Sequence, residues 1–153
     1  MNEVRHMEYL GKLIYSFQCL ETLLRVVLLQ LDPLQHAKAD LDFERMELGA
    51  EIAVNEFTDY ESLRVLCQRF NDHMNSTGAP TLNLGLVDIR DAIAHGRIIC
   101  TSTVFPMRLV KFSKPYSGMV KLLVNDVMDQ DWFELQLLRT RRALDRVQLT
   151  VFV

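Results

Sequence analysis

The sequence lacks the excess of basic residues that binding to nucleic acid by bulk charge requires. Its 153 residues include 17 Lys and Arg against 20 Asp and Glu, which gives a formal net charge of −3. A domain that binds RNA or DNA mainly through its overall charge is basic. Any contact with a nucleic acid must therefore come from a local basic patch.

The sequence also lacks the paired cysteines that mark disulfide frameworks and structural zinc sites. Its three cysteines, Cys19, Cys67 and Cys100, are far apart and include no CxxC pair. Each has apolar neighbours, so we expect buried, reduced thiols in a cytosolic protein. His6, His36 and His73 have no partners at metal-ligand spacing and are assigned no role. No metal and no other cofactor is therefore predicted.

Long apolar runs and glycine-rich loops are missing as well. The most apolar stretch, about 20–31, is interrupted by Glu21, Arg25 and Gln30 and is too short and too polar for a membrane span. The first residues include an acid and do not resemble a secretory signal. Neither a GxSxG element nor a phosphate-binding glycine loop occurs. These absences predict a cytoplasmic protein that does not contact a membrane.

What is present fits a single globular domain over residues 1–153. Hydrophobic residues make up 49% of the chain and charged residues 24%, which is ordinary for a folded protein. Apolar residues recur at helical spacing over about 5–31, 82–95 and 131–148. The chain is therefore predicted to be mainly helical, in the form of a bundle.

Capping residues suggest where some of these helices begin. Thr58 or Asp59 can cap a further helix, whose apolar residues lie at 63–70. Asp129 or Asp131 can cap the last helix. A short helix over Phe43–Leu48 is also predicted, because a glycine follows it in the position of a C-cap.

The region between the third and the last helix has the composition of strands. Arg97–Val104, Met107–Ser113 and Met119–Val127 are rich in Val, Ile, Leu, Thr and Phe, and Lys114–Gly118 has the composition of a turn. We expect a small antiparallel hairpin or sheet here. The predicted fold class is therefore a mainly α helical bundle with this sheet inserted before the C-terminal helix.

The helix over 82–95 carries the residues that point to chemistry. Its core sector is formed by four apolar residues at helical spacing: Leu82, Leu86, Ile89 and Ile93. Asp91 and His95 fall roughly opposite this sector, so His95 is not expected in the core. They are four residues apart and share a face, so Asp91 can accept a proton from one imidazole nitrogen. The negative end of the helix dipole favours the protonated imidazole, which suits a general acid or base.

Arg90 is the third residue of this group. It lies about 140° round the helix from His95, and both side chains are long enough to converge on one phosphate. The planar guanidinium would bind that phosphate with two parallel hydrogen bonds. Val87 and Ala94 lie between Arg90 and His95 on the wheel. Apolar residues on an exposed face suit contact with a second copy of the chain, so we expect a homodimer.

The segment Arg90–Gly96, with the letters RDAIAHG, resembles the motif of the HEPN superfamily. Its ribonuclease members carry an arginine, a polar residue, a few more residues and a histidine near the end of a helix. The resemblance implies a helical bundle whose two motifs face each other across a homodimer and cut RNA without a metal. It implies that His95 acts as acid or base at the ribose 2′-hydroxyl and the leaving oxygen. Arg90 would hold the scissile phosphate, and Asp91 would orient His95.

The resemblance also implies a biological setting, and the chain departs from the family in two places. Ribonuclease members act as toxins, some with an antitoxin protein as partner, or in defence against phage. Members paired with a nucleotidyltransferase antitoxin carry a tyrosine two residues after the histidine, where this chain has Arg97. The strand-rich stretch 97–127 is a second departure, from a plain helical bundle.

Other functions stay open beside the endoribonuclease. The first is a non-catalytic HEPN-like module that binds RNA, a nucleotide or a protein partner. The second is a structural protein that dimerises through the face with Val87 and Ala94. A basic cluster on the last helix could also bind an RNA backbone, although we favour a charged face paired with Glu134 and Asp145. This cluster consists of Arg139, Arg141, Arg142 and Arg146.

Overall fold

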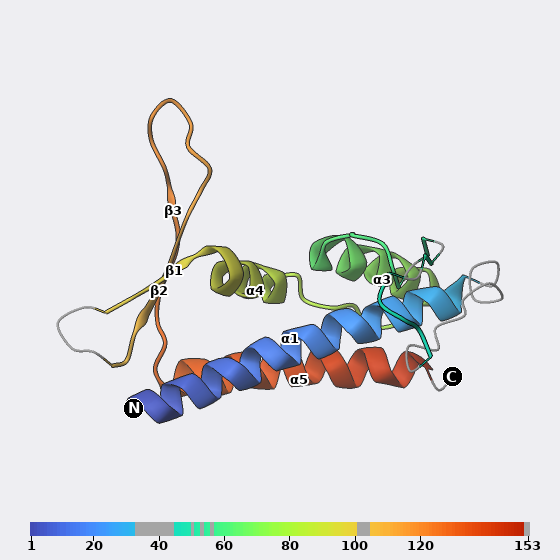
Figure 1. Ribbon diagram of the computed structural model, residues 1–153, viewed down its shortest axis with the longest axis horizontal. Coiled ribbons are helices and arrows are strands. Elements are labelled where there is room, and N and C mark those ends of the chain that lie inside the picture. The colour runs from blue at the N-terminus through green and yellow to red at the C-terminus, as the bar shows by residue number, and fades with distance from the viewer. Residues whose placement is uncertain (33–44, 50, 53, 56, 101–104, 152–153) are drawn as a thin grey trace. The chain divides into compact units, whose positions relative to one another are not determined.

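The computed structural model describes residues 1–32, 45–49, 51–52, 54–55, 57–100 and 105–151 (Figure 1). Within these ranges the chain forms four helices and one three-stranded antiparallel sheet, in the order α1 (Glu3–Leu31), α3 (Leu63–Thr77), α4 (Gly85–His95), β1 (Arg97–Ile99), β2 (Arg108–Phe112), β3 (Leu122–Val127) and α5 (Gln130–Val151). The predicted class, mainly helical with a small antiparallel sheet before the last helix, is confirmed. The predicted helix over Phe43–Leu48 begins outside the described residues, and its described part, 45–48, is not helical.

Helix α1 begins where Asn2 caps it. The Asn2 Oδ1 atom accepts a hydrogen bond from the backbone N–H of Arg5 at 3.0 Å, which satisfies one of the free donors of the first turn. The helix ends at Leu31 because Asp32 precedes a proline, which disfavours helical geometry in the residue before it. The predicted helix over about 5–31 is therefore confirmed.

By length and composition, α1 is also able to cross a membrane. Its most apolar window has a mean hydropathy of 1.3, and 44% of that window is buried inside the molecule. The core helix of a soluble protein passes the same test. The cytoplasmic location inferred from the sequence stays a prediction.

The N-cap of α3 lies three residues after Asp59 and four after Thr58, the two predicted caps. Ser62 is the N-cap, and its side chain accepts a hydrogen bond from the backbone N–H of Val65 at 3.4 Å. Asp59 instead accepts hydrogen bonds from Arg25 and from the backbone of Glu61. The choice of Thr58 or Asp59 as cap was wrong because tertiary partners engage this turn before the helix starts.

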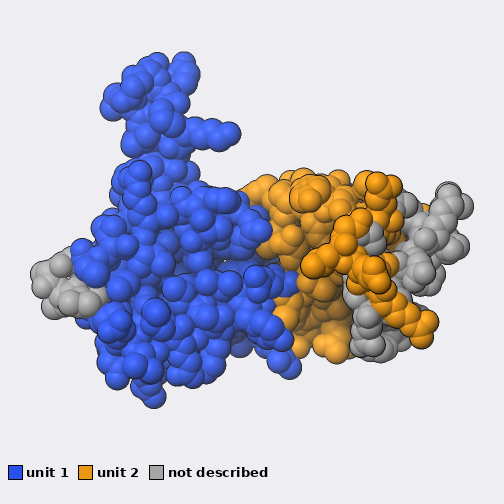
Figure 2. Space-filling view, in the orientation of Figure 1, with its two compact units in different colours: residues 1–18, 83–143 blue, residues 19–82, 144–153 orange. Residues whose placement is uncertain are grey.

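Two compact units divide the described chain, and each is built around its own apolar residues (Figure 2). Unit 1 comprises residues 1–18 and 83–143, and unit 2 comprises residues 19–82 and 144–153. The core of unit 1 includes Leu13, Phe17, Leu86, Val87, Ala92, Leu109, Met128 and Phe133. The core of unit 2 includes Leu20, Leu24, Val27, Leu63, Leu66, Cys67, Phe70 and Val147.

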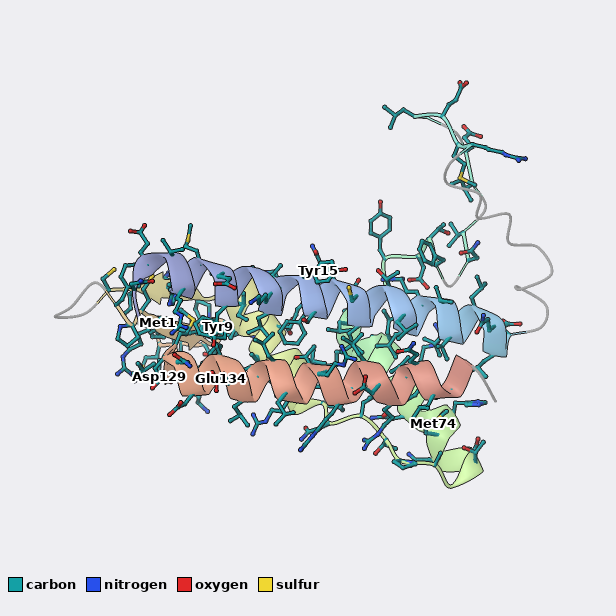
Figure 3. The ribbon with its side chains drawn as sticks, turned by 90° about the horizontal axis from the view of Figure 1, so that it is seen from below. Met1, Tyr9, Tyr15, Met74, Asp129 and Glu134 are labelled. Atoms are coloured by element: carbon teal, nitrogen blue, oxygen red, sulfur yellow. The ribbon has the colours of Figure 1, made fainter. Side chains whose placement is uncertain are left out.

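Within unit 1 the first turns of α1 and α5 lie side by side and run in the same direction. Asp129 caps α5, as predicted, by accepting a hydrogen bond from the backbone N–H of Trp132 at 2.8 Å. The Tyr9 hydroxyl donates to Glu134 at 3.1 Å, so that these two side chains face each other (Figure 3). The ring of Tyr9 stacks on that of Phe133, with the centroids 5.5 Å apart. These contacts hold the first turns of α1 and α5 together.

The sheet has the strand order β1-β2-β3, with antiparallel neighbours throughout. The hairpin between β2 and β3 closes through a two-residue turn at Ser117 and Gly118, both of which have positive φ (50° and 75°). Two positive φ values in succession match the right-handed twist of the strands and favour Asn and Gly. All three strands are shorter than predicted, and part of the first predicted strand, 101–104, lies outside the described residues.

The cysteines differ in exposure, against the expectation that all three are buried. Cys67 is buried on α3, and burial raises the pKa of its thiol to about 11. Cys19 is half-buried and Cys100 is exposed directly after β1. The expectation failed for Cys100 because its apolar neighbours belong to a strand that is itself exposed. All three are free thiols, as predicted.

Candidate functional site

Helix α4 is short and is fixed at both ends. At its start the Asn83 Oδ1 atom accepts a hydrogen bond from the backbone N–H of Gly85 at 2.8 Å. At its end the N–H of Gly96 donates to the carbonyl of Ala92 at 2.7 Å, and the backbone of Gly96 is extended. His95 is therefore the last helical residue, as predicted, and β1 begins two residues later, at Arg97.

Gly96 is required by close packing, and not by an unusual backbone angle. A Cβ atom at this position would overlap the carbonyl oxygen of Ala92 and would lie 2.9 Å from the carbonyl oxygen of Val110 on β2. Both obstacles are backbone atoms, which cannot rotate away. The absence of a side chain at Gly96 thus allows the end of α4 to approach β2, and this contact holds the backbone of His95 in place.

The three predicted site residues do not pair as expected. The Arg90 guanidinium donates to Asp91 Oδ1 at 3.2 Å, and the two side chains are 31% and 30% exposed. The His95 side chain is exposed, and within the described chain no hydrogen bond joins it to Asp91. An arginine–carboxylate pair carries charge on both partners, which strengthens its hydrogen bond. The expected hydrogen bond from the His95 imidazole to Asp91 is therefore replaced by one from the Arg90 guanidinium.

The predicted dimer face on α4 is not present in the expected form. Val87 is only 1% exposed and belongs to the core of unit 1, whereas Ala94 is exposed. Ile89 and Ile93, expected in the core, are half-buried. The burial changes along the helix because the end of α4 contacts β1 and β2, which cover Ala92, a residue outside the predicted core sector. The argument for a dimer from Val87 was therefore wrong.

Two arginines of the basic cluster on α5 have partners other than Glu134. Arg146 donates to the carbonyl oxygen of Thr81 in unit 2, and Arg139 donates to Gln136 at 3.4 Å. Glu134 accepts hydrogen bonds from Tyr9 and Gln130 at 3.1 and 2.8 Å. Glu134 therefore pairs with Tyr9 and Gln130, and the predicted pairing of Glu134 with the cluster was wrong.

His6 was given no role from the sequence, yet it is the most unusual polar side chain of unit 1. It is 1% exposed, and neither ring nitrogen has a hydrogen-bond partner. Its ring lies against those of Phe105 and Phe133, with centroid distances of 5.4 and 5.2 Å. Burial lowers the pKa of His6. The helical spacing indicates this burial, because His6 lies four residues before Leu10 on the apolar face of α1.

Arg25 is the corresponding buried ion of unit 2. It pairs with Glu21, four residues earlier on α1, at 3.3 Å. A second, closer pair joins Arg25 to Asp59 at 2.6 Å, and the guanidinium also donates to the carbonyl of Glu61 at 2.7 Å. Asp59 lies 34 residues away, so local spacing gave no indication of it.

Neither the comparisons nor the described residues add a further element to the site. No family model matches the chain, and the comparisons with curated proteins and with solved structures find no match either. Among the residues that the structure describes, no three His, Cys, Asp or Glu side chains are grouped so that they could hold a metal ion. The candidate site therefore consists of the exposed His95 and the pair formed by Arg90 and Asp91.

Proposed function

We propose that this chain is a metal-independent endoribonuclease of the HEPN type that acts as a homodimer. The observation that carries the proposal is the position of His95. Its imidazole is exposed at the last residue of α4, and its backbone is held by the close contact of Gly96 with β2. Arg90, five residues earlier on the same helix, is partly exposed and is held by Asp91. An imidazole can serve phosphodiester cleavage as an acid or a base, and a guanidinium can bind the phosphate.

The reaction proposed is an internal transfer at phosphorus. The ribose 2′-oxygen attacks the neighbouring phosphorus, the bond from phosphorus to the 5′-oxygen breaks, and a 2′,3′-cyclic phosphate and a 5′-hydroxyl result. A base removes the proton of the 2′-hydroxyl, and an acid protonates the departing 5′-oxygen. One histidine cannot fill both roles at once. Two copies of His95, one from each chain of a dimer, would supply the base and the acid.

Arg90 and Asp91 have distinct parts in this scheme. Arg90 binds the non-bridging oxygens of the scissile phosphate and stabilises the charge that develops on them. Asp91 acts as a positioning residue for Arg90, with which it is paired at 3.2 Å. Asp91→Asn is therefore expected to raise KM and to leave the pH dependence of kcat unchanged. A shifted pH profile would instead assign Asp91 to His95.

The experiment that tests the proposal is RNA cleavage by the purified protein in EDTA. We expect His95→Ala to lower the rate by a factor of about 10² to 10⁴, the usual contribution of a general acid or base. Arg90→Ala is expected to be impaired similarly, and Arg90→Lys only partly rescued, because lysine lacks the planar fork. Arg142→Ala, which removes an exposed cation of α5, is the matched control and should keep full activity. Equal cleavage by all these variants would reject the proposal.

We propose a toxin or a phage-defence effector as the setting, with an antitoxin protein as the partner in the first case. The prediction is that expression of the wild-type chain arrests growth of bacterial cells. The His95→Ala variant, produced at the same level, should be harmless. Equal toxicity of the two would show that growth arrest does not depend on the candidate site.

The alternative is a non-catalytic module of the same fold that binds RNA, a nucleotide or a protein. The pairing of Asp91 with Arg90 favours it, since His95 then has no carboxylate to fix its tautomer. This alternative predicts no cleavage by any variant in EDTA or in the presence of divalent ions. Binding through Arg90 would persist in His95→Ala.

A further inference from the structure

The charges of the chain are distributed unevenly, and the sheet region is basic. Five of the 17 Lys and Arg residues lie between Arg97 and Asn125, and none of the 20 Asp and Glu residues does. A chain of net charge −3 can bind a polyanion only through such a local patch. The five residues are Arg97, Arg108, Lys111, Lys114 and Lys121.

The strand register divides the side chains of the sheet between two faces. Residues directly opposite each other in antiparallel strands share a face, and so do alternate residues along one strand. One face carries Leu109, which is fully buried, and Asp126, which accepts a hydrogen bond from the indole of Trp132 at 3.1 Å. This face packs in part on the rest of unit 1, and Ile98 at its edge is 39% exposed. The other face, called the open face below, carries Arg97, Ile99, Arg108, Val110, Phe112, Asn125 and Val127, of which Val110 is buried.

Large apolar and basic side chains alternate on the open face. Phe112 and Ile99 are each 40% exposed. The Arg97 guanidinium lies over the Phe112 ring at 5.6 Å. Arg108 donates to the side chain and the backbone carbonyl of Asn125, at 2.8 and 3.2 Å. The two guanidinium groups are therefore fixed in place on an exposed surface, and an aromatic ring lies beside one of them.

The basic surface continues onto the hairpin beyond the sheet. Lys114 and Lys121 are exposed there, and Tyr116, next to the turn, is 85% exposed. The backbone of Lys121 is fixed by two hydrogen bonds with Ser113, at 2.8 and 2.9 Å. Figure 2 shows the far end of this hairpin standing clear of the rest of unit 1. A second aromatic side chain and two further cations thus lie along the same arm.

We propose that the open face and the hairpin form the surface that binds single-stranded RNA. Phosphates are complementary to its cations, and unpaired bases stack on exposed aromatic rings and on guanidinium planes. A second copy of the chain is the less suitable occupant, because two such faces would oppose basic residues to basic residues. A duplex is also less suitable, because its stacked bases cannot reach Phe112 or Tyr116.

The location of the open face gives it a place in the proposed reaction, and this part rests on the proposed function. Arg97 follows His95 by two residues, so their Cα atoms are separated by at most about 7 Å. A strand bound along the open face therefore passes close to His95. The sheet region is where the chain departs from a plain helical bundle. It would supply the affinity for RNA that the overall charge of the chain does not.

The test is binding of a fluorescein-labelled single-stranded oligouridylate, measured by fluorescence anisotropy. All proteins carry His95→Ala, so that cleavage does not interfere. Phe112→Ala should weaken binding by about 10-fold, the usual loss for one stacked base, and Phe112→Tyr should restore it. Arg97→Gln with Arg108→Gln should weaken binding further. It should also reduce the slope of log affinity against log salt by about 1.4, or 0.7 for each lost phosphate contact.

The matched control is Arg139→Gln with Arg142→Gln, which makes the same change of charge on α5. Retained binding in this control, with loss in the sheet variants, supports the proposal, provided that circular dichroism shows all variants folded. Equal binding by sheet and control variants overturns it. So does a dimer that dissociates in Phe112→Ala while RNA affinity is unchanged, because the occupant is then a second copy of the chain. Normal RNA binding through the sheet without any cleavage by the His95-containing protein would support this surface and reject the ribonuclease.

Discussion

His6 offers a quantitative prediction that depends only on the packing of unit 1. Its ring is 1% exposed, and both nitrogens lack a hydrogen-bond partner. A buried polar group without a partner costs about 1–3 kcal/mol. Contacts with the rings of Phe105 and Phe133 offset part of this cost, at about 0.5–1.5 kcal/mol for a favourable pair. We therefore expect His6→Leu, which has a similar volume, to stabilise the protein by about 1 kcal/mol.

The same substitution should change the response of stability to pH. Because burial lowers the pKa of His6 below its ordinary 6.5, the unfolded chain takes up the proton more readily than the folded chain. The wild-type protein is thus most stable above about pH 6.5 and loses stability as the pH falls through that value toward the folded pKa. His6→Leu removes this loss.

The assay is urea and thermal unfolding, followed by circular dichroism, on both sides of the titration. We expect the melting temperature of His6→Leu at about pH 8 to exceed that of the wild type by about 3 °C, and the difference to grow at about pH 5.5. His73→Leu, at a half-buried histidine of α3, is the control and should not reproduce the effect. A destabilised His6→Leu with unchanged pH dependence would show that the histidine has a favourable partner, which would refute the reasoning.

Three further substitutions test individual contacts. Gly96→Ala should cost about 2 kcal/mol or more, measured by urea unfolding, because its Cβ would overlap backbone oxygens. Cleavage should fall even where the fold survives. Ser117→Asn should stabilise the hairpin by about 0.5 kcal/mol, since asparagine tolerates positive φ; slower amide exchange there would show it. Arg25→Met should cost about 3 kcal/mol, because it removes the ion pair that Asp59 makes at 2.6 Å. It should also make the free energy of unfolding depend less on pH in the acid range. In the wild type, burial raises the pKa of Asp59, but the hydrogen bonds from the Glu61 N–H and from Arg25 outweigh it and hold this pKa low.

The regular elements were predictable because their signals are local. The apolar stripe of α1, the Asp129 cap of α5 and the stop of α4 at Gly96 depend on residues within a few positions of each other. The sheet followed from composition, although its strands were predicted too long. The local pattern failed at α3, where Asp59 is engaged by Arg25 and Ser62 takes over as the cap. The start of a helix that depends on a partner 34 residues away cannot be predicted from the spacing of neighbouring residues.

The candidate site was predictable to a smaller extent. The helical wheel placed His95 on the outside correctly, because the last turn of α4 is amphipathic. It also placed Val87 outside, where the structure has a core residue, since the wheel assumes one buried side along the whole helix. The contact between Gly96 and β2 requires the sheet to be in place, so the sequence could indicate the glycine but not its reason. Likewise, the open face exists only once the strand register brings Arg97 beside Phe112.

The most direct test of the proposed function is the chemical nature of the ends that the purified wild-type protein leaves on RNA in EDTA. We expect 2′,3′-cyclic phosphate and 5′-hydroxyl ends, produced by the wild type and by Arg142→Ala but not by His95→Ala. Ends with a 3′-hydroxyl and a 5′-phosphate would contradict it, because they require an external nucleophile. Cyclic ends made equally by His95→Ala would contradict it as well.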